Sequence, residues 1–375
     1  MPIFKTAFTQ QVGHSMNILF VSVHLIFNVS TPEHEPLGGS ESCFCYLASA
    51  LAARGHNVTA MMNAPLGTPE VLMGVRHVSP RLASDKAFFE AAAFDVIVYL
   101  NMPDLASGFK AFSPDALHVS WMHGLPNQQS QGSHVPLADC SIYLSRSHHA
   151  AFSSELPAYV IGNGIAPAFE NLFASAKDLY ASKLNRGAYT STPYRGLELL
   201  VIALERLQMD TDVDIYSSMR IYQMPDTPYT ELYNSARRNP SVRYRGAVAQ
   251  PVLARHLRAT AFLFYPCIFP ETYCLAAAEA LAAGLEVISS DYGALKETTM
   301  GHATLLSGEG KTRDEYLDDY CALMKERVVA FKANPRAWAE RRFQQSQDVS
   351  RNCSWTVRAK EWEEVLATAI RDKAA

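Results

Sequence analysis

The sequence predicts an α/β protein made of two doubly wound, parallel-sheet domains that face each other across a cleft. Its 375 residues exceed what one hydrophobic core usually supports. Short apolar runs alternate with stretches that are apolar at helical spacing, which is typical of parallel sheets covered by helices. A glycine turn at Gly162-Asn163-Gly164 separates two such series and indicates the boundary between the domains.

Each series supplies its own elements. The first series predicts one helix, at residues 42–54. It also predicts five buried strands, at residues 17–23, 57–62, 95–100, 116–121 and 141–144. The second predicts strands at 212–216, 260–265 and 285–289, a helix at 199–207 and an alanine-rich helix at 275–283 closed by Gly284. A last amphipathic helix, about 355–371, packs on its own domain or crosses back to the first one.

These elements divide the chain into four parts. The expected parts are a polar N-terminal extension at 1–15, an N-terminal Rossmann-like domain at 16–165, a C-terminal Rossmann-like domain at 166–354 and a final helix at 355–375.

Composition excludes several classes of protein. A formal charge of −4 and the lack of a basic run argue against a nucleic-acid partner. The sequence has no window of 18 or more apolar residues that could span a membrane, so we expect at most peripheral contact with a membrane. Seven cysteines without a CxxC pair indicate free thiols in a reducing compartment. We therefore expect a cytoplasmic protein, free or at the inner face of the membrane.

The segment 269–284 carries the most specific pattern. Glu271 stands just before the alanine-rich helix and Glu279 lies two turns inside it, so their backbones are about 12 Å apart. A ligand that meets both carboxylates could be a nucleotide diphosphate-sugar. The simpler alternative is that Glu271 complements the helix dipole, worth about 0.3–1 kcal/mol, while Glu279 is solvated. The many alanines favour a ligand, because they let it approach the helix closely.

Three further features point to the same cleft, each with a structural alternative. Gly38-Gly39-Ser40-Glu41 follows a long loop at 26–37 and opens a helix, where backbone N–H groups favour a phosphate, or it is an ordinary helix cap. It matches neither a dinucleotide-binding GxGxxG turn nor a phosphate-binding P-loop. Arg195, at a turn before an apolar helix, either holds phosphate oxygens or is solvated. His123 directly follows a buried strand and is either a site residue or structural, and the loop 125–134 after it could cover a ligand.

A possible metal motif is weaker. The run at 210–214 resembles a DxD site, but its last aspartate falls within an expected strand, so we expect no metal there.

Taken together, these motifs resemble the retaining family 4 glycosyltransferases with the GT-B fold. The segment 269–284, with the following 286–297, is similar to the family's E-x7-E segment and its trailing strand and loop. The GGSE turn, the HG pair after a strand, the NGI turn, the RGLELL helix and a C-terminal SW-containing helix occur in the family's order. The resemblance covers residues 16 to about 370.

The resemblance implies a role for each matching residue. Glu279 would hold the donor ribose, and Glu271 would contact the transferred sugar. Gly39 and Arg195 would bind the diphosphate, and His123 would face the sugar or the acceptor. The implied catalytic residues are His123, Glu271 and Arg195, and the implied donor-binding residues are Gly38, Gly39, Ser40, Ser191, Arg195, Tyr273, Cys274, Leu275 and Glu279.

The implied reaction moves a hexose-type sugar from a UDP-, GDP- or ADP-sugar to a glycan, lipid-linked or small-molecule acceptor. It proceeds with retention, needs no metal or other cofactor, and stabilises the departing diphosphate where its charge develops. A catalytically silent sugar-nucleotide-binding module and a related epimerase or phosphorylase are the alternatives.

The sequence also departs from the family pattern. No second basic residue precedes Arg195 in 189–194, so the diphosphate would rely on Arg195, on Ser191 or Thr192, or on Lys183 or Arg186. Cys274 stands where many members have glycine, and Ala166 replaces a common acidic residue.

Overall fold

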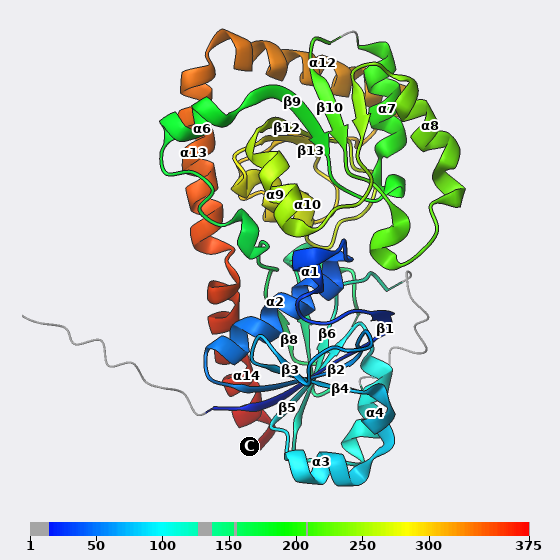
Figure 1. The fold of residues 1–375 in the computed structure, drawn as a ribbon, viewed down its shortest axis with the longest axis vertical. Helices are drawn as coiled ribbons and strands as arrows, with labels where there is room; N and C mark the ends of the chain where they lie inside the picture. The colour runs from blue at the N-terminus through cyan, green and yellow to red at the C-terminus, as the bar shows by residue number, and fades with distance from the viewer. Residues whose placement is uncertain (1–14, 127–136, 154–155, 208, 375) are drawn as a thin grey trace, which may run out of the picture.

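The computed structural model describes residues 15–126, 137–153, 156–207 and 209–374, and these residues form two α/β domains. In Figure 1 the N-terminal domain, blue to cyan, lies below the C-terminal domain, green to orange. Residues 1–14 of the predicted N-terminal extension and residues 127–134 of the predicted loop lie outside the described residues. Within them, no helix is long and apolar enough to cross a membrane.

The first sheet contains eight strands among the described residues, in the order β3-β4-β2-β1-β5-β6-β7-β8. Every neighbouring pair is parallel except β3 with β4. The strands are β1 (Asn17–Ile26), β2 (Asn57–Asn63), β3 (Val71–Leu72), β4 (Val75–Val78), β5 (Val96–Leu100), β6 (Leu117–Trp121), β7 (Cys140–Tyr143) and β8 (Ala158–Val160). The helices are α1 (Thr31–His34), α2 (Gly39–Ala53), α3 (Lys86–Ala92), α4 (Ala106–Lys110) and α5 (Arg146–Ala150).

The five strands predicted here are all present, because continuous apolar runs suit strands that are buried on both faces. The differences concern their ends. β1 continues to Ile26, the predicted loop at 26–37 contains α1, and α2 begins at Gly39 instead of residue 42. The short strands β3, β4 and β8 at the two edges of the sheet were not predicted, because they lack a long apolar run.

The second sheet is parallel, with the order β11-β10-β9-β12-β13-β14 in the part of the chain that the structure describes. Its strands are β9 (Leu184–Tyr189), β10 (Asp212–Ile215), β11 (Val242–Tyr244), β12 (Thr260–Tyr265), β13 (Glu286–Ser290) and β14 (Thr304–Leu306). Its helices are α6 (Ala176–Ser182), α7 (Leu197–Arg206), α8 (Thr230–Arg238), α9 (Gln250–Arg258), α10 (Leu275–Ala282), α11 (Leu295–Thr298), α12 (Arg313–Ala333) and α13 (Pro335–Asn352). Short 3-10 turns include η4 (Pro193–Arg195) and η5 (Met219–Tyr222).

The central strand β9 escaped prediction, because asparagine, arginine and glycine interrupt its apolar pattern. Gly187 is required by packing. A Cβ atom at this position would lie 2.3 Å from a ring carbon of Phe264 on the neighbouring strand β12. The residue that hides the strand in the sequence is thus the one that lets the strand fit into the sheet.

The last helix, α14 (Trp355–Ala374), returns to the N-terminal domain, as the red ribbon in Figure 1 shows. It packs against α2, where Arg54 Nε lies 2.5 Å from Glu363 Oε1. At its far end Lys373 Nζ lies 2.9 Å from Asp139 Oδ2. The chain therefore passes between the domains twice.

Buried side chains cap the C-terminal end of α10. Lys183 Nζ donates to the carbonyl oxygens of Leu257, Thr260 and Ala283 at 3.0, 2.6 and 2.6 Å. From α13, Gln345 Nε2 donates to Leu281 O at 3.0 Å and Ser346 Oγ donates to Ala282 O at 2.5 Å. The carbonyl groups of Leu281, Ala282 and Ala283 at the end of α10 thus have donors, and Lys183 links this end to the end of α9 and the start of β12.

This placement corrects one expectation. Lys183 lies before the first residue of β9, whereas the cleft lies beyond the carboxyl end of that strand, so Lys183 is no phosphate ligand. Arg186 is also away from the cleft, with its Nε 3.5 Å from Asp214 Oδ2. Burial, with the positive charge of Arg258 nearby, holds the pKa of Lys183 well below its ordinary value.

We predict that Lys183→Met lowers the free energy of unfolding by about 3 kcal/mol, because three buried carbonyl groups lose their donor. Urea denaturation followed by circular dichroism measures the change. Lys177→Met, at an exposed position of α6, is the matched control and should stay within about 0.5 kcal/mol of the wild type. Equal stability of the two variants would contradict the capping role.

Candidate active site in the cleft between the domains

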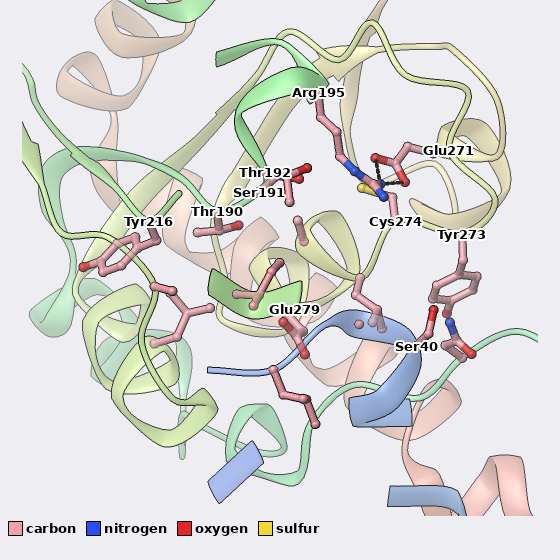
Figure 2. A pocket seen from close by; sticks show the side chains of 18 of the residues that line it. Ser40, Thr190, Ser191, Thr192, Arg195, Tyr216, Glu271, Tyr273, Cys274 and Glu279 are labelled. Atoms are coloured by element: carbon pink, nitrogen blue, oxygen red, sulfur yellow. Dashed lines mark hydrogen bonds and ion pairs between the residues drawn. The ribbon is translucent and has the colours of Figure 1, made fainter. Parts of the chain in front are cut away.

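A pocket lies between the two domains at the carboxyl ends of the strands of the second sheet. Ligands in open α/β sheets bind at this edge. The predicted site residues line the pocket with one exception, Gly38; those that line it are Gly39, Ser40, His123, Ser191, Arg195, Glu271, Tyr273, Cys274, Leu275 and Glu279. Figure 2 shows side chains from both domains around it. The structure therefore brings together residues that are far apart in the sequence.

Gly38 lies beside the pocket as the residue that precedes α2. A Cβ atom there would lie 2.8 Å from a ring carbon of Tyr222, which comes from η5 of the other domain. Next to this contact, the Gln223 side chain pairs with both backbone groups of Ile26, at 3.0 Å from Ile26 N and 2.6 Å from Ile26 O. The glycine lets the second domain close over this side of the pocket.

Arg195 and Glu271 form an ion pair at one end of the pocket, marked by dashed lines in Figure 2. Arg195 Nη1 donates to Glu271 Oε1 at 2.7 Å and to Oε2 at 2.6 Å. The hydroxyl of Tyr265, the last residue of β12, donates to Glu271 Oε1 at 2.5 Å. Burial opposes the charge on Arg195, but the carboxylate of Glu271 outweighs it and raises the pKa of the guanidinium. The carboxylate is fixed in place by these donors.

Glu279 stands inside the pocket on α10, well removed from that pair (Figure 2). Only 5% of its surface is exposed, and its Oε1 accepts a hydrogen bond from Ala166 N at 3.3 Å, where the chain enters the second domain. Burial raises the pKa of Glu279 to about 8. The carboxyl group is thus largely protonated at neutral pH, and it is not the solvated residue of the simpler alternative.

The turn that carries His123 is held from three sides. Asn101 Oδ1 accepts from His123 N at 2.7 Å and from Gly124 N at 3.2 Å. His148 Nε2 lies 2.9 Å from Gly124 O, and Thr272 Oγ1 donates to His123 O at 2.9 Å. These bonds involve the backbone of the turn, so they leave the imidazole free to face the pocket.

The imidazole of His123 is neutral. Burial, with His148 nearby, lowers the pKa of His123 to about 3. Its ring packs edge-on against Trp121, with 4.6 Å between the centroids, and its Nε2 has no partner among the described residues. A neutral imidazole with a free nitrogen can exchange one hydrogen bond with a ligand hydroxyl.

Cys274 occupies the residue before α10 with a φ angle of +78°. This left-handed conformation favours glycine, which gives a physical reason for glycine at this position in many members of the family that the sequence resembles. Burial raises the pKa of the Cys274 thiol well above its ordinary value, so the sulfur is not a reactive thiolate. All seven cysteines of the chain are buried and free, as predicted.

Several buried polar atoms around the pocket have no partner among the described residues. They are His123 Nε2, Asn163 Oδ1, Thr190 Oγ1, Thr192 Oγ1 and Gln250 Oε1. Folded proteins normally pair such atoms, because an unpaired buried group costs about 1–3 kcal/mol. Their concentration around one cleft indicates a site for a polar ligand that accepts and donates hydrogen bonds.

The structure offers no metal-binding cluster in the part of the chain that it describes, where no three histidine, cysteine or acidic side chains are grouped suitably. The run at 210–214 leads into β10, as expected. Asp214 Oδ1 accepts from Arg245 Nε at 2.7 Å, so this carboxylate already has a partner.

Sequence reasoning missed several residues of the pocket. They are Tyr265, Thr272, Thr190, Tyr216 and Gln250. Tyr265 carried a usable signal, because a polar hydroxyl at the last position of a buried strand reaches the edge where ligands bind. Thr190 and Tyr216 directly follow β9 and β10, Gln250 begins α9 and Thr272 lies between β12 and α10, so their places in the pocket depend on the fold.

Residues 184–326 match the family model described as "Glycosyl transferases group 1". This segment runs from β9 into α12 and includes Arg195, Glu271 and Glu279. None of the curated proteins matches the sequence.

Solved structures show the same fold over nearly the whole chain. Sucrose-phosphate synthase from Thermosynechococcus elongatus is 19% identical, with a TM-score of 0.70 over 95% of this chain and 99% of that one. HepE from Anabaena in complex with UDP and glucose is 17% identical, with a TM-score of 0.68 over 94% and 100% of the two chains. A glycosyltransferase from Rickettsia africae is 15% identical, with a TM-score of 0.71 over 95% and 99%. The predicted GT-B fold is therefore confirmed.

We predict a pH dependence of stability from Glu279. Its folded-state pKa of about 8 lies above the ordinary value of 4.5, so the unfolded chain releases a proton that the folded chain keeps. The free energy of unfolding should fall by about 1.4 kcal/mol per unit as the pH rises from about 5 to 8. Glu279→Gln should remove this slope, so that the variant matches the wild type at pH 5 and exceeds it at pH 8. If the free energy of unfolding changed with pH in the same way for the wild type and for Glu279→Gln, the assignment of this pH dependence to Glu279 would be wrong.

Proposed function

We propose that this protein is a glycosyltransferase that moves a hexose-type sugar from a nucleotide diphosphate-sugar to an acceptor, with retention of the anomeric configuration. The match of residues 184–326 to a glycosyltransferase family and the GT-B fold support nucleotide-sugar transfer as the reaction class. The observation that carries the proposal is the pocket itself. It places Glu279 at one end, the Arg195–Glu271 pair at the other and unpartnered polar atoms around them.

The donor would lie along this pocket. The ribose would meet Glu279, whose protonated carboxyl can both donate and accept a hydrogen bond. The diphosphate would lie near Arg195 and the backbone N–H groups at the start of α10, where the helix dipole favours negative charge. Ser191 and the unpaired hydroxyls of Thr190 and Thr192 would supply neutral donors in place of the second basic residue that the sequence lacks.

The transferred sugar would lie between Glu271 and His123. Glu271 still has lone pairs for sugar hydroxyls beyond those that accept from Arg195 and Tyr265. A carboxylate that accepts this many hydrogen bonds is a weak nucleophile, so Glu271 is better suited to orienting the sugar than to attacking it. His123 would contact a hydroxyl of the sugar or of the acceptor from the N-terminal domain.

The reaction would break the bond between the anomeric carbon and the diphosphate oxygen. The acceptor oxygen forms the new bond on the same face of the sugar, and its proton passes to the departing diphosphate. Arg195 would stabilise the negative charge that develops on that diphosphate, which is the step where fixed donors act most strongly. The bonds and the proton then balance without a metal or a redox partner.

The donor nucleotide can be ranked for testing. HepE has been crystallised with UDP-glucose, and it shares the fold of this chain. We therefore propose UDP-sugars as the first candidates, before GDP- and ADP-sugars. We also propose a cytoplasmic location, since all seven cysteines lack a disulfide partner, with at most peripheral contact with a membrane.

A direct test combines binding and turnover. Thermal shift with UDP, GDP and ADP identifies the nucleotide, and release of that nucleotide from its sugar conjugates reports turnover. We expect a shift with one nucleotide and slow release from at least one of its sugars even in water. A shift without any release in the presence of candidate acceptors would favour a catalytically silent binding module, and no shift with any of them would reject the proposal.

We predict opposite kinetic signatures for the two glutamates. Glu271→Gln should lower turnover about 100-fold, because it removes a charged contact to the sugar in the transition state. It should not weaken nucleotide binding, since Arg195 loses its competing carboxylate. Glu279→Ala should weaken nucleotide binding about tenfold through loss of its ribose contacts. Calorimetry and initial rates measure both effects, and the exposed Glu340→Gln is the control. If Glu279→Ala lowered turnover and Glu271→Gln weakened nucleotide binding instead, the assignment of Glu279 to the ribose and Glu271 to the sugar would be wrong.

We predict that transfer activity persists in EDTA. Arg195, the hydroxyl groups and the start of α10 would together stabilise the negative charge of the diphosphate, so a divalent ion is not needed at that position. The measurement compares initial rates with EDTA, after dialysis, and with added Mn²⁺ or Mg²⁺. Activity that EDTA abolishes and Mn²⁺ restores would show that a metal takes part.

A further inference from the structure

Thr272, the neighbour of Glu271, lies on the interface between the domains. Its hydroxyl donates to the carbonyl oxygen of His123 at 2.9 Å, and its own carbonyl accepts from Ser145 Oγ at 2.9 Å. Both partners belong to the N-terminal domain, whereas Thr272 belongs to the loop between β12 and α10. Thr272 also lines the pocket. One residue thus directly joins the turn of His123 to the loop of Glu271.

The residues on either side of Thr272 are fixed to their own domain. Ala294 N donates to Glu271 O at 2.8 Å, and Thr298 Oγ1 donates to Tyr273 O. The side chain of Glu271 is held by Arg195 and Tyr265, which also belong to the second domain. The two hydrogen bonds of Thr272 therefore fix the position of this loop relative to the N-terminal domain.

The approach of the domains on this side does not depend on Thr272 alone. Glu297 of α11 accepts from Arg146 N at 2.9 Å and from Ser147 N at 2.8 Å, at the start of α5. Burial disfavours the charge on Glu297, but the hydrogen bonds from Ser147 and Arg146 outweigh it and lower the pKa of Glu297. Because Glu297 keeps the domains together here, loss of the Thr272 hydroxyl should act locally, on the spacing of the His123 turn and the Glu271 loop.

We propose that Thr272 is a positioning residue for the transfer reaction. Its hydroxyl sets the distance between His123, which would face the sugar or the acceptor, and Glu271, which would orient the sugar. The proposed contacts of Glu279 and Arg195 with the donor nucleotide and diphosphate come from the second domain and do not pass through this bond. The proposal rests on the proposed function, and it assigns Thr272 to the chemical step and not to donor affinity.

The test compares three variants. Thr272→Val keeps the shape of the side chain, removes the hydroxyl and leaves the His123 carbonyl without this donor; Thr272→Ser keeps the hydroxyl. Thr299→Val is the matched control, because it removes a bond of the same kind, from Thr299 Oγ1 to Leu295 O at 2.7 Å, at the C-terminal end of α11. The measurements are kcat and the KM for the donor sugar.

We expect Thr272→Val to lower kcat about tenfold, the loss that one hydrogen bond and one unpaired carbonyl produce together. The KM for the donor should change by less than about twofold, because the contacts that hold the donor before the reaction are not affected. Thr272→Ser should restore kcat to within about threefold of the wild type, and Thr299→Val should match the wild type. A wild-type kcat for Thr272→Val, or an equal loss for Thr299→Val, would overturn the proposal.

Hydrogen–deuterium exchange provides a readout that needs no turnover. In Thr272→Val, peptides covering 119–124 and 266–276 should exchange faster than in the wild type, whereas Thr299→Val should leave both peptides unchanged. Unchanged exchange in Thr272→Val would overturn the link between the two segments even if kcat falls. If no nucleotide-sugar is turned over, the proposed function fails, and the exchange experiment still decides whether Thr272 joins the two segments.

Discussion

Helix α10 is buried on almost every side, and this constraint sets the position of the whole site. Alanine side chains let the helix lie close to its neighbours, which include β13 and α13. Its C-terminal carbonyl groups are capped by Lys183, Gln345 and Ser346, so they do not need water. Its N-terminal end is then free to face the pocket, and Glu279 projects into it from the middle of the helix. Because the C-terminal end of the helix is buried and capped, its N-terminal end is the one that borders the pocket.

The charges of the residues that line the pocket nearly cancel. Arg195 is paired with Glu271, Glu279 is largely protonated at neutral pH, and His123 is neutral because burial lowers its pKa. In the proposed donor complex the diphosphate would bring negative charge, and Arg195 is the cationic side chain among the lining residues. The diphosphate would then share Arg195 with Glu271, and neutral N–H and hydroxyl donors would supply the remaining contacts. The ion pair and the proposed diphosphate contacts would thus use the same guanidinium group.

Sequence reasoning succeeded where a local pattern determines the structure. Continuous apolar runs predicted β1, β5 and β12, and alanine content with Gly284 predicted α10. It failed for β9, because the glycine that Phe264 requires breaks the apolar run. It also placed Lys183 among possible phosphate ligands, since only the fold shows that Lys183 precedes the strand instead of following it. Contacts between domains, such as Thr272 with His123, have no signature in a single sequence.

Because contacts between domains have no signature in a single sequence, the sequence could not reveal a further role of the glycine pair at 38–39. In the sequence, these glycines suggest a phosphate site or a helix cap, and both interpretations concern the N-terminal domain alone. In the structure a Cβ atom on Gly38 would lie 2.8 Å from Tyr222, and one on Gly39 would lie 3.0 Å from Leu275. Both contacts come from the second domain, so close approach of the domains is itself a reason for glycine here. A larger residue at either position would therefore disturb the cleft even if the ligand never touched that residue.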